Sequence, residues 1–284
     1  MNRSVMLVTL GGLVACYNPA ASIDANLDAI VNGDGLDDAD LDGVNNANDN
    51  CVQVANPNQH DSDGDRIGDV CDPCPVDVNT EDTDADGVAG ICDHESDKAN
   101  RIVWFQPFDG SALPAGWSIR GTATTGFGGG GLSILATSPT YLLAPGVTAS
   151  PGRLLAGFST LVTPSSTATA RVGAMTGFDS ATEAHIECNV FRIDTVSSIG
   201  LVRFTTLAST MVLGSTPFSD ALGVGDYVIG LSGNETGGTC QAAKLMTNET
   251  ATGAAPMVLQ GTTGLRVENT SVRVQWLMLV QRKP

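Results

Sequence analysis

The sequence predicts a mainly β protein in which an irregular, disulfide-stapled segment precedes an antiparallel β-sandwich. Charge is segregated along the chain: residues 17–100 hold 21 Asp and Glu against 2 Lys and Arg, whereas residues 101–284 hold 10 against 11. The second region consists of short β-like runs separated by Gly, Pro, Ser and Thr, without an amphipathic stretch of 3.6-residue period. Many short strands with frequent turn signals are typical of a sandwich or barrel.

The first sixteen residues, MNRSVMLVTLGGLVAC, have the features of an export signal. Arg3 supplies a positive start, and the apolar run over residues 5–15 is too short to span a bilayer. The last four residues, Leu13-Val14-Ala15-Cys16, resemble the bacterial lipobox, in which cleavage occurs before a cysteine that then carries lipid. An ordinary secretory signal with an incidental cysteine is the alternative.

The lipobox resemblance implies a signal peptide over residues 1–15, lipidation of Cys16 and a tether over residues 16–31. Because Tyr17 rather than Asp follows the cysteine, the resemblance favours the outer membrane or cell surface of a Gram-negative bacterium. The lipid would be the contact with the membrane, since no later segment is apolar and long enough for a transmembrane helix.

The chain contains seven cysteines, an odd number for an exported protein. Setting one aside for lipid leaves six, which an oxidising compartment would allow to pair and for which fifteen pairings are formally possible. Four lie in the acidic segment and two in separate strand-like runs of the neutral region, where we expect a disulfide to join the sheets. The six are Cys51, Cys71, Cys74, Cys92, Cys188 and Cys240.

The acidic segment repeats one spacing of oxygen-bearing side chains three times. Counted from the first aspartate of each D-x-D-x-D run, positions 1, 3, 5 and 12 are aspartates, and position 7 would offer a backbone carbonyl. Calcium takes six to eight oxygen ligands, which a tightly curled loop can supply from alternate positions. We therefore expect calcium at Asp38, Asp40, Asp42, Val44, Asn46 and Asp49, at Asp61, Asp63, Asp65, Ile67, Asp69 and Asp72, and at Asp82, Asp84, Asp86, Val88 and Asp93. The net charge of residues 17–100 is −19, from 21 acidic against 2 basic residues. This charge excludes nucleic acid as a partner of the segment, because phosphate contacts need Lys and Arg.

Residues 49–75, DNCVQVANPNQHDSDGDRIGDVCDPCP, resemble thrombospondin type 3 repeats in the Asp-Asn-Cys opening, the Asn-Pro-x-Gln run, the aspartate ladder and the closing Cys-Asp. The resemblance extends over residues 32–95. It implies loops that wrap calcium with almost no regular secondary structure. It also implies cysteines that pair in sequence order, as Cys51–Cys71 and Cys74–Cys92.

Two positions depart from the repeat pattern: Arg66 replaces the glycine at position 6 of the second loop, and Gly90 replaces the oxygen donor at position 9 of the third. His60 and His94 lie beside the loops, but imidazole suits calcium poorly, so we expect both side chains to be solvent-exposed. An acidic linker without bound metal is the alternative interpretation of the whole segment.

Residues 105–119, FQPFDGSALPAGWSI, resemble the opening strand of concanavalin A-like jelly rolls of the laminin-G type. Those domains end on a long apolar strand that pairs near the first, and VRVQWLMLVQ could be such a strand. We therefore expect a sandwich over residues 101–284. In its last strand one face should carry Val272, Val274, Trp276, Met278 and Val280.

One sequence feature raises the possibility of catalysis. Glu183, His185 and Glu187 recur at period two, which on a strand places all three on one face. A retaining glycosidase needs two carboxyl groups about 5–5.5 Å apart, and jelly-roll glucanases carry such a pair with Asp between, where this chain has histidine. The alternative is the solvent-exposed face of an antiparallel strand, and we expect a protein that is not an enzyme.

These observations together predict a calcium-binding surface lipoprotein with a rigid stalk that presents a β-sandwich for adhesion or glycan binding. The partners would be calcium, a membrane through the lipid, and a glycan or surface protein. A glycoside hydrolase of the jelly-roll glucanase type and a purely structural spacer are the alternatives.

Overall fold

The computed structural model describes residues 37–78, 81–162, 168–206, 208–219, 222–244, 247–253 and 257–284. The predicted signal peptide, the lipidated cysteine and the tether lie outside these ranges. The chain divides into two compact units between Pro75 and Val76, so the third predicted loop belongs to the second unit. Within the described ranges no helix is long and apolar enough to cross a membrane.

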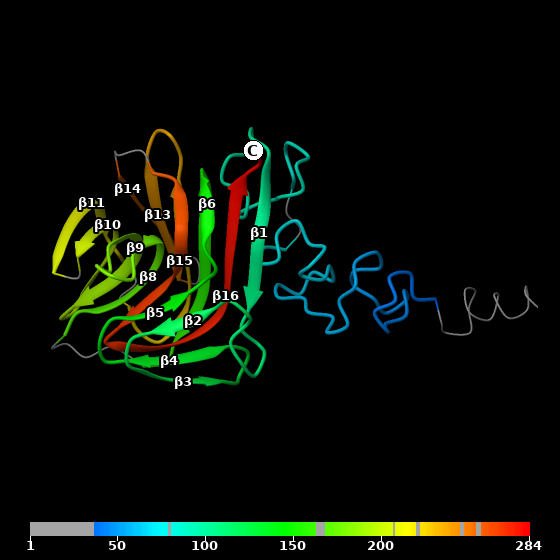
Figure 1. The fold of residues 1–284 in the computed structure, drawn as a ribbon, viewed down its shortest axis with the longest axis horizontal. Helices are drawn as coiled ribbons and strands as arrows, with labels where there is room; N and C mark the ends of the chain where they lie inside the picture. Colours follow the sequence, from blue (N-terminus) through cyan, green and yellow to red (C-terminus); the bar gives the residue numbers. More distant parts are fainter. Residues whose placement is uncertain are drawn as a thin grey trace, which may run out of the picture. The chain divides into compact units, whose positions relative to one another are not determined.

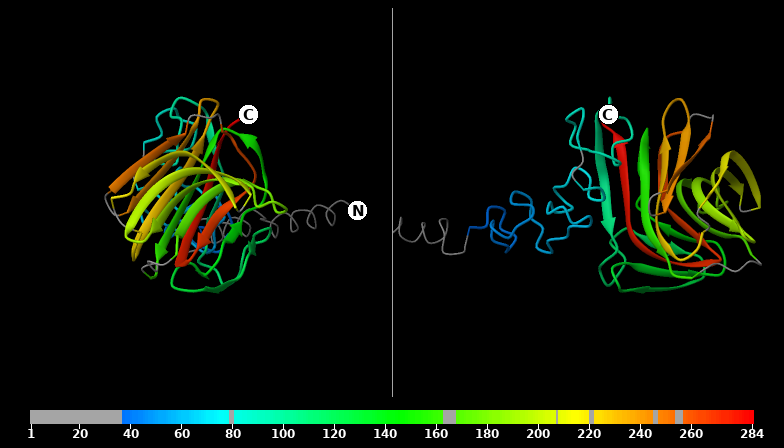
Figure 2. Two further views of the ribbon diagram at one scale, coloured as in Figure 1. Left: turned by 90° about the vertical axis from the view of Figure 1, so that its left-hand side faces the viewer. Right: turned by 180° about the vertical axis from the view of Figure 1, so that it is seen from behind.

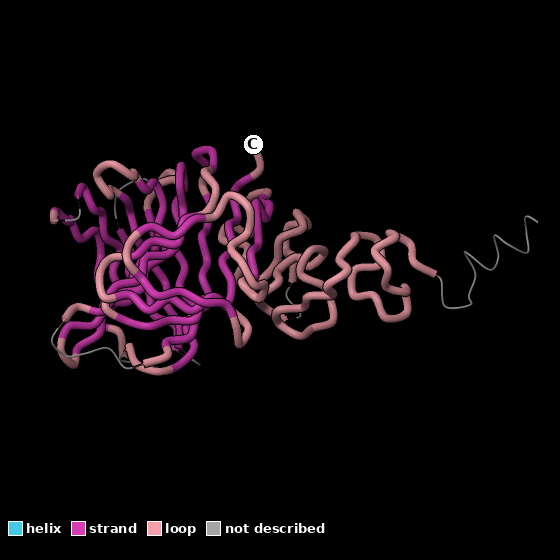
Figure 3. Tube along the Cα trace, turned by 60° about the horizontal axis from the view of Figure 1, so that its bottom comes forward, coloured by secondary structure: helices cyan, strands magenta, loops and turns pink. Residues whose placement is uncertain are grey.

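The first unit, described from residue 37 to Pro75, consists of turns and bends. Figure 3 shows this segment as loop, without strand or helix in its described part. Its backbone amides donate instead to side-chain oxygens and to turn carbonyls, as in the bonds from Asn46 to the Asp37 carbonyl (2.7 Å) and from Gly68 to the Asn50 carbonyl (2.9 Å). A chain this polar has few apolar side chains to bury, so other interactions must hold it.

In the part of the chain that the structure describes, the second unit is an antiparallel β-sandwich of two eight-stranded sheets (Figure 1), which confirms the predicted fold class. Sheet I has the order β14 (Thr247–Gly253), β13 (Gly238–Lys244), β12 (Gly225–Gly233), β7 (Gly152–Thr160), β16 (Thr270–Arg282), β4 (Leu132–Ala136) and β3 (Ala123–Phe127), with β1 (Asn100–Pro107) also pairing β16. Sheet II has the order β11 (Ser209–Pro217), β10 (Val196–Thr206), β9 (His185–Ile193), β8 (Ala170–Phe178), β15 (Leu259–Glu268), β5 (Thr140–Leu143) and β2 (Ser118–Arg120), with β6 (Val147–Ser150) also pairing β15. Figure 2 shows the curved strands of both sheets from two further directions.

The core lies between the sheets and is built from alternate residues of the long strands. In sheet II, Val172 and Ala174 of β8 belong to it, and in sheet I, Leu154 and Phe158 of β7 do. This period-two alternation is what strands with one buried face produce. The first and last strands pair as expected, with Asn100 opposite Arg282 at the end of the β1–β16 ladder.

A disulfide between Cys188 on β9 and Cys240 on β13 links sheet II to sheet I through the core, which confirms the predicted link. Both cysteines are fully buried. The bond closes a loop of 52 residues and so removes conformational freedom from the unfolded chain.

The prediction for the last strand is wrong in one respect. Val272 and Val274 face the core, but the register against β7 shifts between Val274 and Trp276, and the core residues beyond it are Leu277 and Leu279. A β-bulge places one extra residue in the strand and so exchanges its two faces. Trp276 lies on the outer face instead, where a side chain on Gly157 would collide with its ring.

Candidate metal centres

The three aspartate loops share one backbone conformation. Positions 4 and 6 have positive φ in every loop, namely Leu41 (66°) and Gly43 (95°), Gly64 (82°) and Arg66 (82°), and Ala85 (58°) and Gly87 (90°). The left-handed region costs an ordinary residue about 1–2 kcal/mol. Arg66 nevertheless adopts it, so the loss of the position-6 glycine leaves the shape of the second loop intact.

Hydrogen bonds to the first aspartate repeat in the same way. The amide at position 6 donates to Oδ2 at position 1 in each loop, from Gly43 to Asp38 (2.9 Å), from Arg66 to Asp61 (3.0 Å) and from Gly87 to Asp82 (2.8 Å). The amide at position 7 donates to Oδ1 at position 5, from Val44 to Asp42 (2.8 Å), from Ile67 to Asp65 (2.8 Å) and from Val88 to Asp86 (2.7 Å). These bonds curl the chain around its own carboxylates.

The curling brings the carboxylates at positions 1, 3 and 5 together. In each loop, one oxygen from each of these three aspartates lies within 4.8 Å of the other two. The groups are Asp38, Asp40 and Asp42, then Asp61, Asp63 and Asp65, then Asp82, Asp84 and Asp86. Three like charges at this separation repel one another, and a hard divalent cation bound by oxygen would remove the repulsion.

Buried carboxylate oxygens without a hydrogen-bond partner test whether a metal fits. Such atoms include Asp40 Oδ2 at position 3, Asp49 Oδ2 at position 12 of the same loop, and Asp72 Oδ2 at position 12 of the second loop. The other oxygen of each position-12 aspartate is engaged, Asp49 Oδ1 by the Cys51 amide (2.8 Å) and Asp72 Oδ1 by the Cys74 amide (2.7 Å). A buried charged acceptor that stays unsatisfied is costly, and all three aspartates are among the residues predicted to hold calcium.

The pKa values of several loop carboxyl groups are raised by burial and by the neighbouring carboxylates. Burial, together with the charges of Asp63, Asp65 and Asp69, raises the pKa of Asp72 to about 6. Burial likewise raises the pKa of Asp40 in the first loop and of Asp93 in the third, with neighbouring aspartates adding to both shifts. The folded loops therefore disfavour the ionised form of these carboxyl groups when no cation is bound.

The side chains at position 9, predicted as calcium ligands, accept hydrogen bonds from the residue at position 2. Asn46 Oδ1 accepts the amide of Ala39 (2.9 Å), and both oxygens of Asp69 accept hydrogen bonds from Ser62, from its amide (2.8 Å) and its hydroxyl (2.9 Å). These side chains close the loops between positions 2 and 9. The structure thus brings positions 1, 3 and 5 together, and places position 9 in a supporting role.

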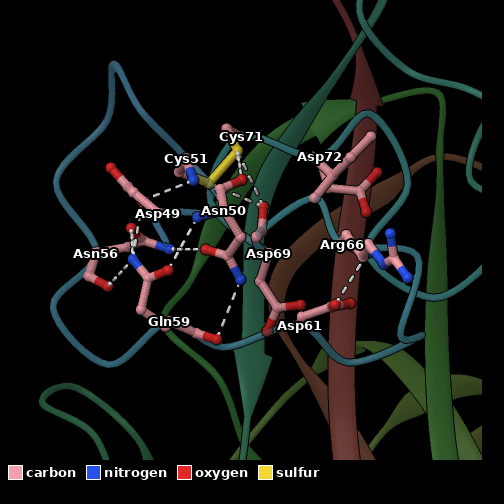
Figure 4. Close-up of a disulfide and its surroundings, with 12 residues drawn as sticks. Asp49, Asn50, Cys51, Asn56, Gln59, Asp61, Arg66, Asp69, Cys71 and Asp72 are labelled. Carbon is pink, nitrogen blue, oxygen red and sulfur yellow. Dashed lines mark hydrogen bonds between the residues drawn. A yellow bond between two sulfur atoms is a disulfide. The ribbon is translucent and has the colours of Figure 1, made fainter. Parts of the chain in front are cut away.

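The Asn-Pro-x-Gln run forms a clamp beside the first disulfide, as Figure 4 shows. Asn56 donates to Asn50 Oδ1 (2.7 Å), and Gln59 donates to Asn56 Oδ1 and to Asp49 Oδ1 (both 2.9 Å). The Asn50 amide donates in return to Gln59 Oε1 (2.9 Å). The clamp holds the position-12 aspartate of the first loop, a role for this run that sequence reasoning did not assign.

The predicted disulfide between Cys51 and Cys71 is present. Cys74 and Cys92 are also disulfide-bonded and fully buried. Disulfides compensate here for the small apolar core of the acidic segment, because they limit the freedom of the unfolded chain.

The third loop is attached to the sandwich through Asn100, the fully buried first residue of β1. Its amide donates to Asp86 Oδ2, and its side chain donates to Asp93 Oδ1 (2.9 Å). Lys283 adds a hydrogen bond to the Asp86 carbonyl (2.7 Å). The position-5 and position-12 aspartates are thereby held by residues at the two ends of the sandwich sequence.

The expectation that both histidines are exposed is wrong. The His94 side chain is only 5% exposed, and burial lowers its pKa to about 4. His60 is half-buried. Sequence spacing could not show this, because the third-loop segment packs against the sandwich and covers His94 there, as the contact of Cys92 Sγ with Met278 Sδ (3.8 Å) illustrates.

The two glutamates considered for catalysis do not share a strand face, and only Glu183 is partly exposed. Glu183 precedes β9 with a φ of 58°, and its carboxylate accepts hydrogen bonds from Tyr141 (3.1 Å) and Arg120 (3.3 Å). Glu187 is fully buried on the outer face of sheet II. A carboxylate without exposed surface cannot meet a substrate, so the structure does not offer this pair as a glycosidase site.

Glu187 belongs instead to a buried charge network. His185 Nε2 lies 3.1 Å from its carboxylate, Asn189 donates to it, and Arg171 and Arg266 lie 3.6 and 3.7 Å away. Burial opposes ionisation, but the His185 hydrogen bond and the two guanidinium groups outweigh it and lower the pKa of Glu187. Sequence reasoning missed Arg266, which strand pairing places opposite Gly173 of β8 from far along the chain.

Comparison with known proteins gives fold-level likeness only. No family model matches the chain, and no curated protein matches it. Among solved structures, the CBM2 module of the evolved Dit of Lactobacillus casei BL23 phage J-1 has a TM-score of 0.47 at 9% identity, over 65% of this chain and 97% of that one. The carbohydrate-binding module CBM66 from Bacillus subtilis has a TM-score of 0.43 at 13% identity, over 56% and 92%. A Bacillus subtilis protein of unknown function with a galectin-like fold has a TM-score of 0.47 at 9% identity, over 64% and 97%.

At these scores the likenesses carry no functional argument. The class defined by the fold is an antiparallel β-sandwich preceded by aspartate loops, and the proposals below depend on this chain's own residues.

Proposed function

We propose that the acidic segment binds calcium in its three loops and serves as a metal-stiffened stalk for the β-sandwich. The observation that carries the proposal is the set of buried carboxylate oxygens without a partner, Asp40 Oδ2, Asp49 Oδ2 and Asp72 Oδ2, at ligand positions of two loops. Each loop also gathers one carboxylate oxygen from each of its position-1, position-3 and position-5 aspartates within 4.8 Å of one another. Such all-oxygen donor sets suit a hard cation.

Calcium would act on the stalk by neutralising charges that otherwise oppose folding. The first unit has few apolar residues to bury, so its ordered state depends on the disulfides and on the ligands. With ions bound, the loops would resist unfolding and proteolysis. Without them, the aspartates would repel one another and the segment would loosen.

Calorimetric titration of calcium into the metal-free full chain tests the proposal. Extracellular modules bind calcium with dissociation constants of about 10⁻⁴–10⁻³ M, so binding should be visible at millimolar calcium. Replacing Asp40, Asp63 and Asp84, the position-3 residue of each loop, by alanine removes one oxygen ligand from every loop and should abolish the heat. The matched control replaces the exposed, non-loop Asp37, Asp97 and Asp109 in the same way. Unchanged heats in the first triple variant would refute the proposal.

We further propose that Cys16 carries lipid and holds the protein at the cell envelope, with the sandwich facing a glycan or surface protein. The lipobox-like run Leu13-Val14-Ala15-Cys16 supports this. Expression in a Gram-negative host should place the protein in the membrane fraction, and Cys16→Ser should release it. A serine variant that remains in the membrane fraction would contradict lipid anchoring.

A further inference from the structure

A polar cavity of about 390 Å³ lies in the second unit, between the end of the third loop and the β12–β13 hairpin. Asp93 and His94 form one side, and Arg153, Thr239 and Gln241 of sheet I form the other. The remaining lining residues belong to the hairpin and are glycine, serine, asparagine and threonine. This volume is within the range of small-molecule pockets, about 300–1,000 Å³.

The wall in sheet I consists of side chains at one level across three neighbouring strands. Arg153 of β7 pairs with Ser232 of β12, which pairs with Thr239 of β13. Their sequence neighbours Leu154, Leu231 and Cys240 face the core, so this polar row faces outward. The register of the sheet therefore presents a guanidinium and two hydroxyl groups side by side.

Arg153 is held in place by protein groups. Its Nη1 donates to the Ile91 carbonyl (2.7 Å) and its Nη2 donates to Gln241. Its guanidinium crosses Gly230, where a side chain would come within 3.3 Å of Nε. Nε itself is buried and has no partner, so the arginine contributes a fixed guanidinium to the cavity wall and no free Nε donor.

His94 adds two more polar atoms without a hydrogen-bond partner. Its side chain is 5% exposed, and neither ring nitrogen makes a hydrogen bond, although Nε2 lies 3.5 Å from Glu95. A buried imidazole without partners carries an energetic cost. His94 therefore borders the cavity with its hydrogen-bonding capacity unused.

The hairpin side of the cavity is rigid before any ligand binds. Asn234 Oδ1 accepts the Thr236 amide (2.9 Å), the Thr236 hydroxyl (2.7 Å) and the Gly237 amide (3.1 Å). Arg282 joins Glu95, beside the third loop, to Glu235 of the hairpin, with a shortest contact of 2.7 Å to each. A preformed site of this kind loses little freedom on binding.

We propose that this cavity binds a neutral polyhydroxylated ligand, a mono- or disaccharide unit of a glycan. The two charged side chains of the lining are engaged by protein groups, Asp93 within the third loop and by Asn100, and Arg153 by the Ile91 carbonyl and Gln241. Neither is free to select an ion, and the lining lacks the apolar surface that an apolar ligand needs. Carboxylate, guanidinium, imidazole, amide and hydroxyl groups together supply donors and acceptors, which suits sugar hydroxyls because each of them both donates and accepts. Apart from the His94 imidazole no lining residue is aromatic, so affinity should come from hydrogen bonds and should be weak, about millimolar.

This inference deepens the proposed function by naming the glycan site of the sandwich, and its test separates the two. The probes are glucose, galactose, mannose, N-acetylglucosamine and their β-linked disaccharides, titrated onto the full chain in calcium and observed by saturation-transfer difference NMR. Calcium binding is measured by calorimetry on the same samples. Calcium binding without sugar binding would overturn this inference alone, and sugar binding without calcium binding would overturn the stalk proposal alone.

Two variants locate the site. Thr239→Val removes one hydroxyl without changing side-chain shape, and His94→Phe keeps a ring while removing both nitrogens. Each should weaken sugar binding about tenfold. The control is Thr125→Val, the same change at an exposed position of β3 at the other edge of sheet I. Binding that is unaffected in Thr239→Val and His94→Phe, or no saturation transfer to any of the sugars, would overturn the proposal.

Discussion

Replacing Asp72 by asparagine should change the stability of the second loop in opposite directions with and without calcium. Asp72 is 8% exposed, its Oδ1 accepts the Cys74 amide, and its Oδ2 has no partner. Asparagine has nearly the same shape and keeps an acceptor for the amide. The substitution therefore isolates the effect of the charge.

Without calcium, the charge destabilises the folded loop. Burial first, and then the charges of Asp63, Asp65 and Asp69, raise the pKa of Asp72 from 3.8 to about 6. The folded state therefore binds more protons than the unfolded state between these values, and stability falls as pH rises through that window. One pKa unit corresponds to 1.36 kcal/mol. After an allowance for solvent screening, Asp72→Asn should stabilise the metal-free loop at pH 7 by about 1–2 kcal/mol.

With calcium, the same variant should lose stability. An ion present at one hundred times its dissociation constant stabilises its site by about 2.7 kcal/mol. A loop without its position-12 carboxylate should forfeit most of that increment. The calcium-induced gain in the second loop should therefore fall from about 2–3 kcal/mol to near zero.

Hydrogen exchange measured by mass spectrometry resolves this effect, because all three tryptophans lie in the sandwich sequence and their fluorescence cannot report on the first unit. Peptides that cover residues 61–72 are compared in EDTA and in calcium, with the exposed Asp37→Asn as the matched control. Equal calcium protection in the parent and in Asp72→Asn, or faster exchange of the variant in EDTA, would refute the reasoning.

Four further predictions concern individual residues. Arg66→Gly should stabilise the second loop by about 1 kcal/mol, because glycine adopts a φ of 82° without strain; slower exchange over residues 61–72 in calcium would show it, and unchanged exchange would contradict it. Arg266→Met should destabilise the sandwich by about 3–5 kcal/mol in urea unfolding followed by tryptophan fluorescence, since it leaves Glu187 buried with one guanidinium fewer. Because the pKa of Glu187 is lowered in the folded state, its ionised carboxylate stabilises the sandwich at any pH above the ordinary pKa of glutamate. This stabilisation is lost as pH falls through the pKa of the folded state, so the free energy of unfolding of the sandwich should decline below about pH 4.5. A Glu187→Gln variant with the same decline would argue against this. Replacing Cys188 and Cys240 by alanine should cost about 4 kcal/mol from loop-closure entropy over 52 residues, and the urea midpoint of the double variant measures it.

The aspartate loops could be predicted from the sequence because every contact within them is local. Positions 1, 3, 5 and 12 lie within twelve residues, and the repeated bonds from position 6 to position 1 need only a short curled segment. Local spacing therefore determined which carboxylates converge. It could not determine that Arg66 would adopt the left-handed conformation of Gly43 and Gly87, because only the bonds around it settle whether that strain is tolerated.

The burial of Glu187 and its contacts with arginine depend on tertiary structure. Its spacing from Glu183 suggested one face of a strand, but the positive φ of Glu183 ends that alternation before β9 begins. Its burial depends on Arg266, which lies far along the chain and reaches it only because β15 pairs with β8 and β8 with β9. A period-two pattern cannot distinguish a solvated polar face from a buried one.

By itself the sequence determined the β class and the spacing of the three aspartate loops, and its resemblances implied the Cys51–Cys71 disulfide and the pairing of the first strand with the last. A disulfide between Cys188 and Cys240 was expected because the two cysteines lie in separate strand-like runs. Only the tertiary structure decided which face of β16 is inside after its bulge, that His94 is buried, and that Asp93 and Arg153 line one cavity. The first group depends on residue spacing, on strand-like runs with turn signals and on motifs that resemble known families, all of which the chain carries locally or at its two ends. The second depends on strand register and on the third loop packing against sheet I, which bring together residues that no local pattern connects.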